Sequence, residues 1–322
     1  MLAGDTDNRL NVLLKRRAAG DELETDCHKS ACFLWPLWLM GLYCTAMEQF
    51  EEKFGSLARL YGDEVLAQIR HSHICVVGIG GVGSWVVEAL ARSGVGRLTL
   101  VDGDAVSRSN TNRQIHALES TLGRNKTEVM RERILDINSA CEVEVINSYI
   151  DDDNLREILE HRHEGRFFDG VVDAIDSIKF KAAMIYCCKR NKIPMVTTGG
   201  AGGLTDPTLV EIKDLTRTWN DPLAASVRSR LRFKYGYTRN LKRSFGVPCV
   251  FSSEQQRYPD AQGQPGYCKP GVAGLSLDCN FGYGSSVMVT ASFGFAAASC
   301  IIERVLRERR LDLVKNKQPE AK

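Results

Sequence analysis

The sequence has no Cys-x-x-Cys pair, although it contains eleven cysteines. Cys187 and Cys188 are adjacent, while Cys249, Cys268 and Cys279 are widely spaced, so the usual ligand pattern of a structural zinc site is missing. The count is odd and several cysteines lie within apolar runs, which argues against a secreted disulfide framework. We therefore expect no structural zinc, and reduced, mostly buried thiols in a cytoplasmic protein.

The sequence also has little net charge, with 42 basic and 40 acidic side chains and a formal charge of +2. Contact with a nucleic acid would therefore depend on a local basic patch rather than on the field of the whole molecule. Hydrophobic residues make up 43% of the 322 positions, enough for one large or two modest globular domains. Global disorder is excluded.

Residues 1–46 differ from the rest and form a predicted N-terminal extension. An apolar stretch at 31–47 is about as long as the shortest membrane-spanning helix, and Pro36 interrupts it. Three interpretations stay open: membrane association through this stretch, a disordered extension, or an artefactual extension upstream of a true start at Met47.

From His73 onward, apolar strands alternate with amphipathic helices. Strands are predicted at His73–Gly78, Arg97–Asp102, Glu142–Asn147, Gly170–Ala174 and Pro194–Thr198. Helices are predicted at Val82–Ser93, Lys126–Asn138, Asp152–His161 and Ser177–Arg190. This alternation predicts an α/β fold of Rossmann type, with a mostly parallel sheet covered by helices on both faces.

After Gly203 the regular alternation stops. We predict a nucleotide-binding core over 73–203, an irregular basic region over 204–284, and a C-terminal helix within 285–310. The apolar stretch Val287–Leu306 in this last part is rich in Ala, Gly, Ser and Thr, so it predicts a close-packed core helix better than a membrane span.

A glycine-rich string follows the first strand and opens the first helix. Gly78, Gly80, Gly81 and Gly83 allow a tight turn and close approach of the backbone to a phosphate, and the helix N-terminus offers free N–H groups. Asp102 ends the next strand, where a carboxylate can bind the ribose hydroxyls. At this point NAD, FAD and ATP fit equally well.

Further polar residues distinguish these nucleotides. Asp104 follows Asp102, Arg113 and Lys126 can neutralise a triphosphate, and Asp176 follows the fourth strand, where it can hold Mg2+. A dehydrogenase has no need of these extra cations and this carboxylate around its phosphates. The set favours an adenylating enzyme with ATP and Mg2+ as cofactors over an NAD-dependent oxidoreductase.

With these motifs, the sequence resembles the E1-like (ubiquitin-activating-like) adenylating enzymes, which include molybdopterin and thiamine pathway adenylyltransferases. The resemblance implies an E1-like domain over 47–322, in which Asn110, Arg113 and Lys126 contact phosphates and Asp176 assists the metal. Arg59 lies where the family has an arginine that reaches the triphosphate of the neighbouring subunit. The resemblance therefore implies a homodimer, although a solvated arginine on a helix face also fits Arg59.

A second resemblance is narrower. The strings Phe54–Gly62, Asn110–Leu118, Thr197–Gly203 and Asp221–Ala224 are similar to those of the tRNA threonylcarbamoyladenosine dehydratases. This family implies ATP-dependent activation of the threonyl carboxylate of N6-threonylcarbamoyladenosine in tRNA, followed by ring closure. Some bacterial members also work with a cysteine desulfurase and its sulfur acceptor.

A basic run interleaved with aromatic residues is the candidate tRNA-binding surface, since cations neutralise phosphates and aromatic rings stack on unpaired bases. Its cations are Arg228, Arg230, Arg232, Lys234, Arg239, Lys242 and Arg243. A solvated helix face with a loop is the alternative. The main rival function is adenylation of the C-terminal glycine of a ubiquitin-like or sulfur-carrier protein. That rival would normally show Cys-x-x-Cys pairs or a clear thioester cysteine, so it ranks second. Cys249 is the candidate for a catalytic cysteine, but the dehydratase chemistry requires none and a buried thiol is the favoured interpretation.

Overall fold

The computed structural model of this chain describes residues 37–160, 165, 167–260, 262–267 and 284–316. The chain divides into two compact units, Met1–Thr45 and Ala46–Lys322. Within the first unit, only 37–45 are described, and they belong to helix α2 (Leu37–Tyr61), which begins directly after Pro36. The predicted membrane-associated stretch 31–47 thus lies partly outside the described residues.

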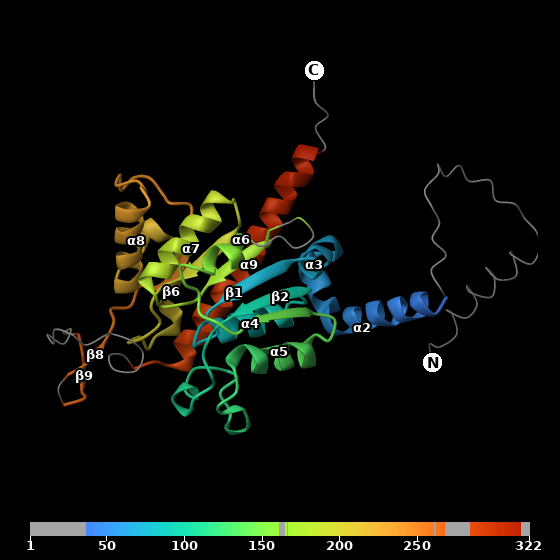
Figure 1. Cartoon of the computed structure of the whole chain (residues 1–322), viewed down its shortest axis with the longest axis horizontal. Helices are drawn as coiled ribbons and strands as arrows, with labels where there is room; N and C mark the ends of the chain where they lie inside the picture. The colour runs from blue at the N-terminus through green and yellow to red at the C-terminus, as the bar shows by residue number, and fades with distance from the viewer. Residues whose placement is uncertain (1–36, 161–164, 166, 261, 268–283, 317–322) are drawn as a thin grey trace, which may run out of the picture. The chain divides into compact units, whose positions relative to one another are not determined.

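The second unit is built on a seven-stranded sheet (Figure 1) with the order β3-β2-β1-β4-β5-β7-β6. All neighbouring strands are parallel except the edge strand β6, which pairs antiparallel with β7. The strands are β1 (His73–Val77), β2 (Arg97–Val101), β3 (Glu142–Ile146), β4 (Gly170–Asp173), β5 (Met195–Thr198), β6 (Val210–Asp214) and β7 (Pro248–Ser252). The predicted α/β fold with a mostly parallel sheet is confirmed.

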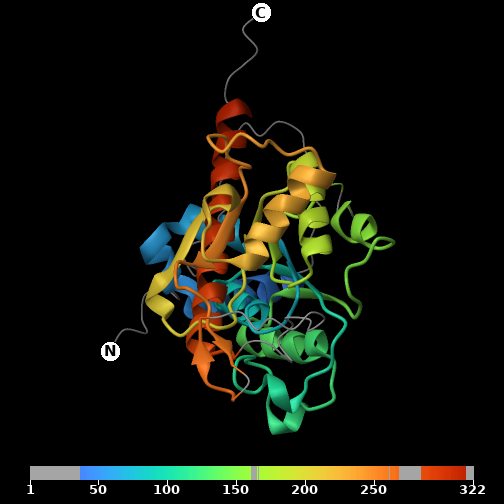
Figure 2. The same ribbon diagram turned by 90° about the vertical axis from the view of Figure 1, so that its left-hand side faces the viewer.

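Helices cover both faces of this sheet, and each face has its own apolar core. One face carries α3 (Asp63–Arg70), α4 (Gly83–Arg92), α5 (Lys126–Ile137) and α9 (Val287–Asn316). The other carries α6 (Leu155–Glu160), α7 (Ile178–Arg190) and α8 (Pro222–Lys234). Helices α7 and α8 pack side by side (Figure 2). The two-sided burial explains the continuous apolar character of β1, whose five residues are all buried.

Helix α9 crosses the sheet against β4, β5, β6 and β7 (Figure 1). Val287–Arg309 has the length and composition of a membrane span, but 44% of an 18-residue apolar window within it is buried inside the fold. Its small residues permit very close approach: a Cβ on Gly294 would lie 2.5 Å from Cβ of Trp85. Helix α9 therefore packs at close range against α4 and the sheet.

The region after Gly203 is more regular than the sequence predicted. Strands β6 and β7 extend the central sheet, and α8 covers one face of it. The signal is weak because β6 is an edge strand with the sequence Val-Glu-Ile-Lys-Asp, in which no residue is fully buried. Helix α8 is capped by Asp221, whose side chain accepts a hydrogen bond from the backbone N–H of Ala224, and it begins with Pro222.

Candidate nucleotide-binding site

The glycine loop lies between β1 and α4 at the carboxyl edge of the sheet. Gly78 has a φ of 88°, and a Cβ there would lie 2.9 Å from the carbonyl oxygen of Ala174. A Cβ on Gly83 would lie 1.7 Å from the carbonyl oxygen of Gly78. Both positions therefore require glycine. The loop closes on itself and against the end of β4, at the point where the strand order reverses and ligands of such sheets bind.

Asp102 anchors this loop from the end of β2. Its Oδ2 accepts a hydrogen bond of 2.6 Å from the backbone N–H of Ile79, and its Oδ1 accepts one of 2.8 Å from that of Asp104. Burial raises the pKa of Asp102, although Lys126 and the two backbone N–H groups act in the opposite direction. The predicted ribose-binding carboxylate thus lies directly beside the glycine loop.

Lys126, the first residue of α5, is almost fully buried and carries its ammonium group to the same edge. Its Nζ lies 2.7 Å from Oδ2 of Asp104, and the hydroxyl of Tyr149 donates to the other oxygen. Burial opposes ionisation of Asp104, but the hydrogen bonds from Lys126 and Tyr149 outweigh it and lower its pKa. A buried cation held next to Asp102 is suited to meeting the negative charge of a phosphate.

Arg113 reaches the glycine loop from the segment after the short 3-10 helix η1 (Arg108–Asn110). A Cβ on Gly81 would lie 3.3 Å from its Cδ, and Trp85 of α4 donates to its backbone oxygen at 3.0 Å. The guanidinium donates to the oxygen of Ser109 at 2.6 Å. Asn110 is buried, and its Oδ1 accepts from the N–H of Ser107, which fixes the turn.

Asp176 lies in the turn between β4 and α7, at the same edge of the sheet as the glycine loop. It is exposed and forms no ion pair with the residues that the structure describes. Within this described part of the chain, no three His, Cys, Asp or Glu side chains gather as a metal site. A single exposed carboxylate at this edge nevertheless fits Mg2+, which is commonly held by one or two carboxylates, phosphate oxygens and water.

Arg59 is not brought to this site by the contacts of its own chain. It is exposed in the last turn of α2 and forms no hydrogen bond or ion pair with any described residue. The structure therefore places Asp102, Asp104, Arg113 and Lys126 around the glycine loop, while no contact among the described residues joins Arg59 to them.

The basic run divides into inward and outward side chains. Arg228 is half-buried on α8, and its guanidinium donates to the oxygen of Leu215 at 3.2 Å and to the hydroxyl of Thr218. Burial and the neighbouring Arg232 lower its pKa. Lys234, Arg239, Lys242 and Arg243 are exposed, as is Phe233, with 88% of its surface accessible. Arg228 thus ties α8 to the fold, and the exposed cations form the surface that a ligand could reach.

Sequence patterns missed several residues of this edge. Tyr149 supports Asp104 from 45 positions away, so no local motif joins them. His116 is 1% exposed, and both of its ring nitrogens lie buried without a hydrogen-bond partner among the described residues. The string Asn110–Leu118, quoted above for its resemblance, contained His116, but its burial could not be deduced from that string.

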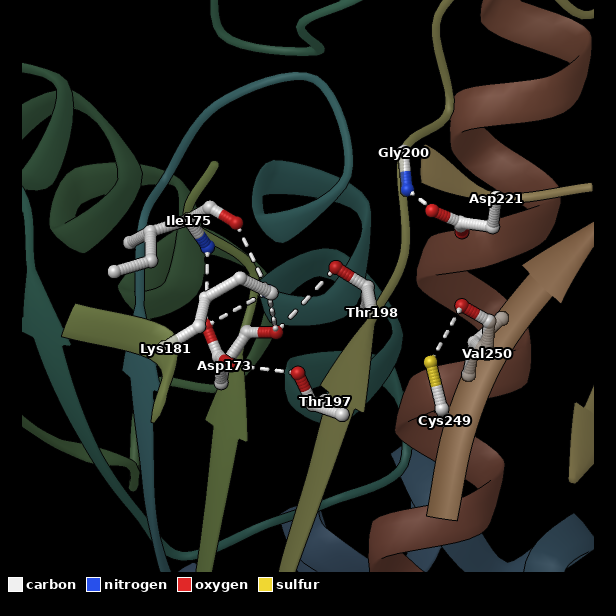
Figure 3. A network of polar contacts seen from close by, with 9 residues as sticks. All are labelled: Asp173, Ile175, Lys181, Thr197, Thr198, Gly200, Asp221, Cys249 and Val250. Carbon is white, nitrogen blue, oxygen red and sulfur yellow. Dashed lines mark hydrogen bonds and ion pairs between the residues drawn. The ribbon is translucent and has the colours of Figure 1, made fainter. Parts of the chain in front are cut away.

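Cys249 in β7 is fully buried, and its thiol faces the carbonyl oxygen of Val250 at 3.7 Å (Figure 3). Burial raises its pKa far above the ordinary value of a thiol. A cysteine nucleophile requires an accessible thiolate, so the interpretation of Cys249 as a buried thiol is confirmed.

The fold and the site define an adenylating enzyme of the Rossmann type. The ThiF family matches residues 55–316, and the chain belongs to this family. Within it, the chain is 47% identical to the tRNA threonylcarbamoyladenosine dehydratase of Escherichia coli, over 80% of this chain and 95% of the relative. The dehydratase of Haemophilus influenzae is 46% identical over 84% of this chain and its own full length. The narrower of the two resemblances is thereby confirmed.

Solved structures agree with this assignment. The E. coli dehydratase TcdA in complex with ATP superposes with a TM-score of 0.70 and 45% identity, covering 81% of this chain and 96% of that chain. The structure described as TcdA (CsdL) gives a TM-score of 0.74 and 46% identity, with the same coverage of both chains. ATP is the nucleotide bound in that complex of the E. coli relative.

Proposed function

We propose that this protein is an ATP-dependent tRNA threonylcarbamoyladenosine dehydratase, which converts N6-threonylcarbamoyladenosine at position 37 of tRNA to its cyclic form. The observation that carries this proposal is the 47% identity that spans 95% of a dehydratase, joined to a glycine loop surrounded by Asp102, Arg113 and Lys126. Adenylation of the C-terminal glycine of a carrier protein is not favoured.

The chemistry follows from the weakness of a carboxylate as an electrophile. Its negative charge repels nucleophiles, and its oxygen leaves poorly. Transfer of AMP to the threonyl carboxylate forms an acyl-adenylate and releases pyrophosphate, after which AMP leaves as a stabilised anion. The attacking group already belongs to the same modified nucleoside, so proximity supplies much of the acceleration of ring closure.

Each side chain near the loop has a role in this proposal. Asp102 binds the ribose hydroxyls, Asn110, Arg113 and Lys126 offset the charge of the phosphates, and Asp176 holds Mg2+. Mg2+ would neutralise the charge that develops on the departing pyrophosphate. Asp104 keeps the ammonium of Lys126 in place through their 2.7 Å ion pair.

The partners follow from the same proposal. The exposed cations of the basic run bind tRNA phosphates, and a second copy of the chain supplies Arg59. This accounts for the exposed position of Arg59, which has no ion pair with the residues that the structure describes. The enzyme acts in the cytoplasm, where its tRNA substrate is. Cooperation with a cysteine desulfurase and a sulfur acceptor stays a prediction from the resemblance.

The direct test is incubation of the protein with ATP, Mg2+ and tRNA that carries threonylcarbamoyladenosine. We expect AMP and a nucleoside lighter by one water, measured by mass spectrometry. Arg113→Ala should abolish both products, whereas Arg108→Ala, which changes an exposed arginine five residues earlier, is the matched control. An unchanged nucleoside mass with ATP-binding protein would exclude the dehydratase activity.

A further inference from the structure

A buried ion pair lies beneath the turn that carries Asp176. Nζ of Lys181, in α7, is 3.0 Å from Oδ1 of Asp173, the last residue of β4, and their side chains are 1% and 0% exposed (Figure 3). Taking both charges out of water is costly, and replacement of such a pair by apolar residues is often neutral or stabilising. A contribution to the stability of the fold is therefore not enough to explain why a lysine is buried at position 181.

The other bonds of Lys181 point to the backbone of the turn. Its Nζ donates to the carbonyl oxygen of Ile175 at 2.9 Å and approaches that of Asp173 at 3.4 Å. Ile175 immediately precedes Asp176 in the chain. One ammonium group thus holds two carbonyl oxygens at the start of the β4–α7 turn, and Figure 3 shows Lys181 next to Asp173 and Ile175 with these contacts dashed.

The neighbouring strand fixes the other side of the pair. The hydroxyl of Thr197 in β5 donates to Oδ2 of Asp173 at 2.6 Å, and that of Thr198 donates to the backbone oxygen of Asp173 at 3.3 Å. Both oxygens of the Asp173 carboxylate are therefore occupied, and the carboxylate has little freedom to rotate.

The same turn forms a wall of the glycine loop. The carbonyl oxygen of Ala174 lies 2.9 Å from where a Cβ of Gly78 would be. A shift of the turn would therefore displace both the Asp176 carboxylate and the surface on which Gly78 rests. Ligand sites lose affinity when the groups that orient their side chains are removed.

We propose that Lys181 is a positioning residue for the nucleotide site, which fixes the β4–α7 turn so that Asp176 presents its carboxylate to Mg2+ beside the glycine loop. The proposal rests on the function argued above, and it assigns Lys181 no contact with ATP or with the tRNA. It acts through Asp173 and the carbonyl oxygen of Ile175.

The test uses the whole chain and measures ATP binding by calorimetry, with and without Mg2+. Lys181→Met alone would leave the Asp173 carboxylate buried without a counter-charge, so it is combined with Asp173→Asn. We expect this double variant to unfold near the wild-type temperature and to lose about 10–100-fold in Mg2+-dependent ATP affinity. The matched control is Lys179→Met with Asp152→Asn, which removes an exposed ion pair of the same helix and should bind ATP as the wild type does.

A mutant cycle with Asp176→Asn shows whether Lys181 affects ATP binding through Asp176. If Lys181 acts through Asp176, adding Asp176→Asn to the double variant lowers the Mg2+-dependent affinity no further. Wild-type ATP affinity in the folded double variant, or losses that add in full, would overturn the proposal. If the double variant does not fold, Thr197→Val gives the same comparison with both charges kept: weaker Mg2+-dependent binding supports the proposal, and unchanged binding overturns it.

These measurements need no tRNA. Failure of the proposed function would appear as an unchanged nucleoside mass with wild-type protein, while the effect of Lys181 on ATP binding would be unaffected by that result.

Discussion

Nζ of Lys126 lies 2.7 Å from Oδ2 of Asp104, with 5% of the lysine side chain and 47% of the aspartate side chain exposed. The pair therefore joins a buried cation to a half-exposed anion at the mouth of the glycine loop. Because Lys126 lies almost out of water, its charge depends on Asp104 while no phosphate is bound.

We predict that Asp104→Asn destabilises the protein by about 1–2 kcal/mol at neutral pH, less than the loss of a fully buried pair because Asp104 is partly solvated. The pKa of Asp104 is lowered in the folded state. Its contribution is therefore complete above the ordinary value of 3.8 and is lost as the pH falls below it.

Urea unfolding of the Asp104 variant and the wild type across this pH range gives the measurement. Asp152→Asn, which breaks the exposed Lys179–Asp152 pair, is the control and should leave the free energy of unfolding nearly unchanged. A constant difference between Asp104→Asn and wild type down to strongly acidic pH would contradict the prediction.

Substitutions at Gly80 and at Gly83 should affect folding and nucleotide binding differently. A Cβ on Gly80 would meet nothing closer than Nε2 of Gln114 at 3.9 Å, whereas one on Gly83 would collide with the oxygen of Gly78. We expect Gly80→Ala to unfold within about 0.5 kcal/mol of wild type, yet to bind ATP at least about tenfold more weakly, a cost of about 1.4 kcal/mol. The added methyl would stand where the backbone approaches the phosphates.

Gly83→Ala should lose both stability and ATP binding, since the backbone of the loop must move. Gly55→Ala, where a Cβ would meet nothing within 4 Å, controls for the substitution itself. Calorimetry with ATP and thermal unfolding of each variant distinguish an effect on binding from an effect on folding. Wild-type ATP affinity in Gly80→Ala would show that the glycine loop does not bind the nucleotide.

The burial of His116 makes stability depend on pH. Burial, with the nearby charges of Lys126 and Arg133, lowers the pKa of His116 to about 3. Below its ordinary value of 6.5, the unfolded chain takes up a proton that the folded chain refuses, so stability falls as the pH decreases from 6.5 toward 3. The expected slope is about 1.4 kcal/mol per pH unit in the middle of this range.

His116→Leu should remove that part of the slope, because leucine takes up no proton. Urea unfolding at several pH values between these limits measures the slope, with Met130→Leu as a control at another buried position. An equal slope in His116→Leu and wild type would show that another group causes the acid sensitivity.

The sequence predicted those parts of the fold where burial is two-sided. Strand β1 is a short run of buried residues next to a glycine turn, and its predicted and observed ends differ by one residue. Strand β6 alternates charged and apolar residues at the edge of the sheet, and its pairing with β7 joins residues about forty positions apart. Neither the strand propensity of the residues nor the hydrophobic periodicity of the sequence identifies a pairing strand this far along the chain.

The site shows the same division. Asp102 and Lys126 each follow a recognisable local pattern, a strand end and a helix start. The support of Asp104 by Tyr149 and of Asp173 by Thr197 depends on how strands lie side by side, with 45 and 24 positions between the partners. Candidate ligand-contacting residues can therefore be identified from sequence motifs, whereas the residues that orient those side chains can be identified only from the three-dimensional structure.

Phe233 and Arg228 lie five positions apart on α8 and should behave in opposite ways. Phe233 is 88% exposed beside Lys234, so it is available to stack on an unpaired base. We expect Phe233→Ala to weaken tRNA binding by about 1–3 kcal/mol and to change the free energy of unfolding by less than about 0.5 kcal/mol.

Arg228→Ala should instead destabilise the protein by about 1–3 kcal/mol, because the buried oxygen of Leu215 keeps only the hydroxyl of Thr218 as a donor and that hydroxyl loses its bond from Arg228. It should leave the salt dependence of tRNA binding unchanged, whereas Lys234→Ala should reduce that slope by about one. Filter binding at several salt concentrations, with urea unfolding of each variant, checks all three. Wild-type affinity for tRNA in Phe233→Ala, together with a wild-type salt slope in Lys234→Ala, would show that the tRNA does not bind at α8.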